Sequence, residues 1–264
     1  MSTAHPAPAS AQRIRLHELS ARRGGALALD RVTCALPAGA VTAIVGGNGS
    51  GKSTMLEVLA GVLEPSGGRV DGLPASRALV VQRSESDDRL PLTGRQAVAM
   101  GLWRERGLLA PLGADGRRRI DAALAAVGME GLAERQLPAM SGGQRQRVLV
   151  AQGLVQRAPL LLLDEPAAAA DAEGRDRIDE ALAAAAAVGA TVVLATHDRE
   201  SLARADRAIL LERGRLVAEG APEEVAREQA ARAAASLAPA ARAVQREAQR
   251  AGGPVELRTT SSGT

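Results

Sequence analysis

The chain has 264 residues, of which 46% are hydrophobic and 24% charged, a composition typical of a globular protein with a buried core. Its formal net charge of +3 and its single aromatic residue, Trp103, argue against nucleic acid as a partner, because a base-stacking platform needs several rings. The single cysteine excludes an internal disulfide and a multi-cysteine zinc site, and no apolar run is long enough to span a membrane.

Residues 13–45 predict strands separated by turns. Apolar residues recur along 14–19 and alternate along 32–36, and residues 37–39 have the composition of a turn. Within the alternating run, Cys34 is expected to be a small buried hydrophobe, with a reactive thiol as the alternative.

A second group of elements surrounds a glycine-rich loop. Residues 41–45 are a short, mostly apolar run, which predicts a strand buried on both faces. The loop follows directly, and residues 52–61 then predict a helix. Another short buried strand is expected at 78–81.

The middle of the chain differs from both ends, because residues 84–157 carry helical patterns and no convincing strand. Helices are expected at 94–103, 117–127 and 142–157. Strands and helices then alternate, with strands at 160–163 and 191–195, helices at 171–188 and 200–205, and a hairpin of 208–212 with 215–218. This alternation predicts an α/β fold with a mostly parallel core sheet, into which the helical stretch is inserted as a subdomain.

Both ends of the chain are expected to lie outside the folded domain. Residues 1–12 are rich in Ala, Pro and Ser and lack the apolar region of a secretory signal, so they are predicted to be disordered. The Ala/Arg-rich tail, 232–264, is interrupted by Pro239 and predicts a weak helix followed by disorder. A docking helix for a partner is the alternative.

The glycine-rich loop is the strongest chemical signal in the chain. It fits the pattern G-x-x-x-x-G-K-[ST] and lies between a buried strand and a helix, the context that a phosphate-binding loop requires. Glycines let successive N–H groups point at phosphate oxygens, and the helix N-terminus favours negative charge there. A glycine-rich turn without function is the alternative. The predicted nucleotide-binding residues are Gly46, Gly47, Asn48, Gly49, Ser50, Gly51, Lys52, Ser53 and Thr54.

Two residues of this loop are unique in the chain. Lys52 is the only lysine, while every other basic residue is arginine, and Asn48 is the only asparagine. A compact ammonium fits between phosphate groups where a planar guanidinium does not, so we expect Lys52 to bind the β- and γ-phosphates. The Ser53 hydroxyl is expected to bind Mg²⁺.

A second signal is the apolar run 160–163 followed by Asp164 and Glu165. Adjacent carboxylates at the end of a buried strand suit a site for a metal-bound phosphate. Asp164 is expected to hold Mg²⁺ through water, and Glu165 to orient or deprotonate an attacking water.

A third motif indicates the family. Ser141, Gly142, Gly143 and Gln144, which precede Asp164 by a short spacing, resemble the signature motif of ABC ATPases. Ser141 is also expected to cap the helix that follows, and both readings can hold together. In this family the signature contacts the γ-phosphate of ATP bound to the other subunit of a dimer, which implies a homodimer in the ATP-bound state.

Three more positions match the family in the expected order. Gln82 follows a strand as the family's Q-loop glutamine does, which implies contacts with Mg²⁺ and with the attacking water. His197 resembles the switch histidine that touches the γ-phosphate, and Asp171 the aspartate of the D-loop. The resemblance spans about 14–225 and implies a P-loop NTPase, RecA-like core with an antiparallel N-terminal β portion. The implied ATPase domain is 13–231, with core segments 13–84 and 160–231 and a helical subdomain 85–159.

The sequence departs from the family in two places. Matching the N-terminal loop places Arg23 where an aromatic residue usually stacks on adenine. A guanidinium plane stacks on a base too, so Arg23 is either a substitute platform or a solvated side chain. The D-loop has four alanines, 167–170, where Thr, Gly and Leu are common.

The resemblance also implies a role for the whole protein. Pro91, Thr93, the segment 100–103 and the acidic stretch 85–88 resemble the ATPases of zinc and manganese importers. Such an ATPase, with ATP and Mg²⁺, works from the cytoplasmic face of the membrane. It powers a separate integral membrane permease and, indirectly, a solute-binding protein. Iron-chelate import is the next alternative, followed by an ABC ATPase without a transporter or a P-loop interaction module.

Overall fold

The computed structural model describes residues 13–81, 91–107 and 111–235. The expectations for Gln82, for residues 1–12 and for most of the tail therefore lie outside the described residues. The chain divides into two compact units at the Ala226–Arg227 bond, and all elements named below with a label belong to the first unit. No helix within the described ranges is long and apolar enough to cross a membrane.

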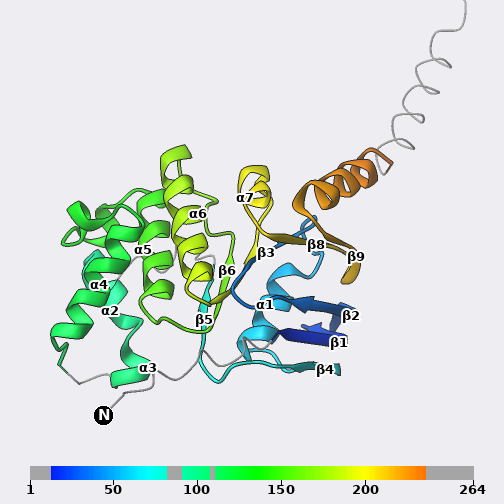
Figure 1. The fold of residues 1–264 in the computed structure, drawn as a ribbon, viewed down its shortest axis with the longest axis horizontal. Helices are drawn as coiled ribbons and strands as arrows, with labels where there is room; N and C mark the ends of the chain where they lie inside the picture. Colours follow the sequence, from blue (N-terminus) through cyan, green and yellow to red (C-terminus); the bar gives the residue numbers. More distant parts are fainter. Residues whose placement is uncertain (1–12, 82–90, 108–110, 236–264) are drawn as a thin grey trace, which may run out of the picture. The chain divides into compact units, whose positions relative to one another are not determined.

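A six-stranded sheet forms the centre of the first unit (Figure 1). Its strand order is β5-β6-β7-β3-β8-β9, and every pairing is parallel except that of β8 with β9. The strands are β5 (Arg77–Val80), β6 (Leu160–Asp164), β7 (Thr191–Ala195), β3 (Val41–Val45), β8 (Arg207–Glu212) and β9 (Arg215–Gly220). The α/β fold with a mostly parallel sheet is thus confirmed.

The central strands are apolar because both of their faces are buried. In β6, Leu161 and Leu163 pack into one hydrophobic cluster, while Leu160 and Leu162 pack into another on the opposite face. Side chains alternate across a strand, so a continuous run of leucines supplies both clusters.

Helix α1 (Lys52–Ala60) lies between this sheet and a smaller, antiparallel one (Figure 1). The smaller sheet has the order β2-β1-β4 and confirms the expected antiparallel β portion. Its strands are β1 (Ile14–Arg23), β2 (Ala26–Leu36) and β4 (Gly67–Asp71). The apolar pattern does not predict β4, since none of its residues is fully buried. In β2, Cys34 is buried and burial raises the pKa of its thiol to about 12, which supports the expected hydrophobic role.

A second group of helices follows. They are α2 (Gly94–Met100), α3 (Trp103–Arg106), α4 (Ala114–Ala126), α5 (Gly142–Leu154) and α6 (Ala172–Ala187), with short 3-10 turns at Glu130–Leu132 and Leu137–Ala139. Helices α5 and α6 pack on the other face of the large sheet, while α2 and α4 pack against α5. The helix expected over 94–103 is two helices, since α2 ends at Met100 and α3 begins at Trp103; between them a Cβ at Gly101 would lie 2.5 Å from the Gln152 oxygen. The bounds predicted for the inserted subdomain remain a prediction.

Two more helices follow near the end of the described chain. Helix α7 (Arg199–Ala203) lies between β7 and β8 and begins at the capping residue Asp198. Residues 222–235 are helical. In the second unit, Arg232 bonds to Glu228 one turn earlier, at 2.6 Å.

Candidate functional site

Three neighbouring strands bring the predicted catalytic motifs to one edge of the sheet. Asp164 of β6 pairs with Ala195 of β7, and Ala195 pairs with Ile44 of β3. The phosphate loop follows β3, Glu165 follows β6, and His197 follows β7 by two residues. Because all three strands are parallel, these segments leave the sheet at the same edge, where α/β folds bind ligands.

Glycine is required at two positions of the phosphate loop. At Gly46, φ is +149° and a Cβ would lie 2.2 Å from the Leu211 oxygen. At Gly51, φ is +105° and a Cβ would lie 2.7 Å from the Ala28 oxygen. Side chains are therefore excluded where the loop passes against β8 and β2, whereas Gly47 faces open space.

The Lys52 ammonium lies inside the loop. Its Nζ donates to the carbonyl of Gly46 at 2.9 Å and to that of Gly47 at 3.3 Å. These bonds hold the charge at the N-terminus of α1, where the backbone N–H groups also favour an anion. The only lysine of the chain thus lies within the loop and at the N-terminus of α1.

A distant hairpin supports the loop from behind, which the sequence motifs do not indicate. Gly214, in the turn between β8 and β9, donates its N–H to the Ser50 carbonyl at 3.0 Å. Its own carbonyl accepts from the Asp30 N–H at 2.9 Å. A Cβ at Gly214 would lie 2.6 Å from the Ala28 oxygen, so only glycine permits this contact.

Glu165 and His197 form a close pair of ionisable side chains at this edge of the sheet. The Nδ1 of His197 lies 2.7 Å from the Glu165 carboxylate. The glutamate side chain is 13% exposed and the histidine 70%, so the pair reaches from the protein interior to solvent. A base and its orienting partner at hydrogen-bond distance are the geometry that proton transfer needs.

The backbone at Glu165 is strained and held in place. Its φ is +52°, which is uncommon for a residue other than glycine. The Glu165 N–H donates to the Ala195 oxygen at 3.0 Å, and the Glu165 carbonyl accepts from the Gln146 amide at 3.4 Å. Strain of this kind persists only where neighbours impose it, and it is common at active sites. Gln146 is a supporting residue that sequence reasoning missed.

Hard oxygen ligands for a magnesium ion are available at the same edge. The Asp164 carboxylate is half-buried and has no hydrogen-bond or ion-pair partner among the described residues. Ser53 lies in the first turn of α1. The described part of the chain contains no cluster of three or more His, Cys, Asp or Glu that would hold a metal alone. This donor set fits Mg²⁺, which binds through one or two carboxylates together with substrate phosphates.

The signature residues form the N-terminus of α5. The Ser141 hydroxyl accepts from the Gln144 N–H at 3.2 Å, and the Gln144 side chain accepts from the Ser141 N–H at 3.0 Å. This is the capping box, so the expected capping role of Ser141 is confirmed. At Gly143 a Cβ would lie 2.6 Å from the Ala169 oxygen. The signature residues therefore pack closely against the alanines of the D-loop.

Two other predicted site residues have structural partners. Asp171 caps α6, because its carboxylate accepts from the Gly174 N–H at 2.9 Å. Arg23 ends β1, and its guanidinium lies 3.0 Å from the Glu57 carboxylate of α1. Neither contact tests the contribution of these residues to a nucleotide site.

The chain is similar to known proteins along most of its length. A family model described as ABC transporter matches residues 29–168. A hemin import ATP-binding protein of Nocardia farcinica is 40% identical over 220 residues, which cover 77% of this chain and 75% of the relative. A zinc import ATP-binding protein of Aliivibrio fischeri is 34% identical over 215 residues, which cover 80% and 84%. Other relatives are named for cobalt, putrescine and manganese transport.

A solved structure shares the fold as well. A dimeric ATP-binding cassette bound to ADP and Pi superposes with a TM-score of 0.67 at 26% identity. The match covers 79% of this chain and 98% of that one.

Proposed function

The chain belongs to the ABC transporter family of ATP-binding proteins, and from this premise we propose that it is the ATP-hydrolysing subunit of an importer for zinc or manganese. The observation that carries the ATPase role is that the Lys52 ammonium, the Asp164 carboxylate and the Glu165–His197 pair lie at one edge of the sheet. We propose that this edge is the nucleotide site.

Each residue has a distinct task in this proposal. The Lys52 ammonium donates hydrogen bonds to oxygens of the β- and γ-phosphates. The backbone N–H groups of the loop bind the remaining phosphate oxygens. Glu165 orients the attacking water and accepts its proton, while His197 holds the carboxylate and contacts the γ-phosphate. Arg23 and Gln82 are the proposed contacts for the base and for the water.

Ser53, Asp164 and Gln82 would hold a magnesium ion in this site. The ion, when bound with ATP, supplies neutralisation of phosphate charge.

The proposed site is completed by a second copy of the chain. Two copies bind two ATP molecules, each between the phosphate loop of one copy and residues Ser141–Gln144 of the other. The N-terminus of a capped 13-residue helix suits an anion, and the related cassette bound to ADP and Pi is dimeric. The two contacts are related by a two-fold axis, so the assembly closes on itself.

The cargo proposal rests on relatives and on local motifs. The zinc relative and a manganese relative each match about four fifths of the chain or slightly less, at 34% and 36% identity. The chain would bind peripherally to a permease at the cytoplasmic face, with a solute-binding protein as an indirect partner. Import of a metal chelate such as hemin is the second candidate, since the hemin relative is 40% identical.

One uptake experiment separates these cargoes. A strain that lacks the gene for this chain is complemented with wild type or with Lys52→Ala, and the uptake of radioactive zinc, manganese and iron-labelled hemin is measured. The proposal expects zinc or manganese uptake to be restored by wild type only. Restoration of hemin uptake alone would favour the second candidate, and equal uptake with Lys52→Ala would contradict the ATPase role.

A further inference from the structure

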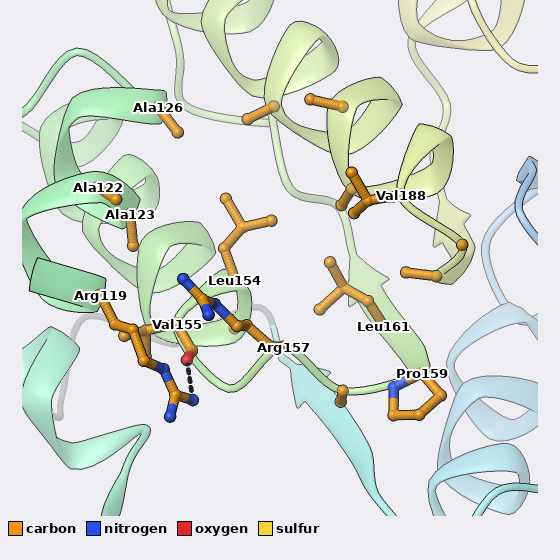
Figure 2. A pocket seen from close by; sticks show the side chains of 17 residues that line it. Arg119, Ala122, Ala123, Ala126, Leu154, Val155, Arg157, Pro159, Leu161 and Val188 are labelled. Atoms are coloured by element: carbon orange, nitrogen blue, oxygen red, sulfur yellow. Dashed lines mark hydrogen bonds between the residues drawn. The ribbon is translucent and has the colours of Figure 1, made fainter. Parts of the chain in front are cut away.

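A cavity of about 690 Å³ opens between α4, α5 and α6 (Figure 2). Pro159 and Ala190, which precede β6 and β7, lie on its wall. The proposed nucleotide site lies at the opposite end of the same strands, after Asp164 and Ala195. The cavity is therefore separate from the nucleotide site.

Small apolar side chains create this cavity. Three alanines of α4 face it, and three more come from α6, including Ala185. Their side chains end at Cβ and leave the space between the two helices unfilled, while Leu154 and Leu161 add larger apolar surfaces (Figure 2). The volume lies within the range of pockets that bind small molecules.

Among the described residues, two arginines are the only ionisable ones on the cavity wall, and none of the described carboxylates lines it. Arg119 is 8% exposed and bonds to Glu105 at 2.8 Å and to the Val155 carbonyl at 2.7 Å, but its Nε is buried without a partner. Arg157 is exposed, and its guanidinium has no hydrogen-bond or ion-pair partner within the described ranges. In Figure 2 its guanidinium extends across the cavity toward the α4 side. A solvated positive charge without a carboxylate partner among the described residues thus lies at the open side of an apolar cavity.

We propose that the cavity binds an amphipathic carboxylate, a molecule with an acidic head group and a flexible apolar tail. The Arg157 guanidinium would bind the carboxylate in a charge-assisted hydrogen bond, which is stronger than a neutral one. The alanine walls and the two leucines would take the tail out of water. A neutral apolar ligand would make no ionic contact with the Arg157 guanidinium, and a cationic ligand would be repelled by it. This site does not depend on the proposed ATPase function.

Decanoate is a suitable probe, titrated by calorimetry into the full-length chain without nucleotide. Wild type is expected to bind one decanoate per chain. Arg157→Ala should weaken binding roughly tenfold or more, which corresponds to the loss of a charge-assisted hydrogen bond. Ala185→Leu should abolish binding because the new side chain fills the cavity. The matched control, Ala187→Leu, lies on the same helix but outside the cavity and should bind as wild type does.

Further arms make the test decisive. Decyltrimethylammonium has the same tail and the opposite charge, and it should not bind. Ala126→Leu fills the cavity from the α4 side and replaces Ala185→Leu if that variant does not fold. The proposal is overturned if wild type does not bind decanoate, if decyltrimethylammonium binds equally, or if Arg157→Ala binds unchanged. It is also overturned if filling the cavity changes the association state of the chain instead, because the groove would then be an interface between copies.

Discussion

At the scale of single residues, Glu165 combines strain, burial and a partner. Its φ is positive, its backbone bonds to the Ala195 oxygen and accepts from the Gln146 amide, and its carboxylate lies 2.7 Å from His197. Asp164, one residue earlier, ends a regular strand, and its carboxylate has no partner among the described residues. The adjacent carboxylates of Asp164 and Glu165 thus have different environments, which supports different roles for the two residues.

Replacement of Glu165 by Gln is the first prediction. The amide keeps the size of the side chain and its contact with His197 but cannot accept a proton from water. We expect ATP binding to remain within about threefold, while turnover falls roughly a hundredfold or more. Fluorescent-nucleotide binding and phosphate release measure the two effects. Turnover near that of wild type would contradict the assigned role.

At the scale of elements, the junctions between strands and helices carry the site. Capping side chains begin α2, α5, α6 and α7, and glycines turn the chain from β3 into α1. The glycines are not equivalent, because a Cβ added at Gly46 would collide with the backbone of β8, whereas one added at Gly47 would meet no atom within 4 Å. The two glycine positions therefore differ in whether they tolerate a side chain.

This difference gives a paired prediction for stability. Gly46→Ala should lower the free energy of unfolding by about 2–3 kcal/mol, because its Cβ would collide with a fixed carbonyl. Gly47→Ala should change it by less than about 0.5 kcal/mol. Urea denaturation of both variants without nucleotide measures this. Equal values for the two would show that the loop moves freely away from β8.

The cap of α7 predicts a pH dependence. Burial opposes ionisation of Asp198, but hydrogen bonds from Ser201 and the charge of Arg175 outweigh it and lower the pKa of this carboxyl. A carboxyl with a lower pKa in the folded state stabilises the fold above its unfolded pKa, and this contribution is lost as pH falls through the folded pKa.

The matched variant for this prediction is Asp198→Asn, which retains an oxygen for the cap but has no charge to titrate. Wild type should be more stable than the variant at pH 7, and the difference should shrink as the pH is lowered below the ordinary carboxyl pKa. Urea denaturation at several pH values measures it. A difference that stays constant with pH would contradict the assignment to Asp198.

At the scale of the whole molecule, a single chain contains both halves of the proposed nucleotide site, and in the proposal each half would be completed by a second copy of the chain. The phosphate loop follows β3, while the signature begins α5 and packs on the D-loop. The four alanines of that D-loop offer few polar groups to a second copy. We therefore expect ATP itself to supply much of the attraction between two copies.

Mixing two inactive variants tests the shared site. Lys52→Ala removes the phosphate contact, and Ser141→Arg blocks the signature, so neither should hydrolyse ATP alone. Random pairing in an equal mixture leaves one intact site in half of the dimers and should restore roughly a quarter of the wild-type sites. Phosphate release from the mixture measures this. A mixture as inactive as its components would argue against sites shared between copies.

Local patterns in the sequence predicted much of this protein. The apolar runs predicted the buried strands β3, β6 and β7, because strands buried on both faces need uninterrupted apolar residues. The phosphate loop and the capping box were predictable for a similar reason, since each depends on a few residues that are close together in the chain.

Only the tertiary structure decided which distant residues meet. The Gly214 support of the phosphate loop, the Gln146 bond to Glu165 and the Arg23–Glu57 pair join ordinary residues far apart in the chain. The alanine-walled cavity arises in the same way, from helices that are individually unremarkable. The physical reason is that backbone conformational preference depends on neighbouring residues in the sequence. Packing between elements depends on surfaces that come together only when the chain has folded.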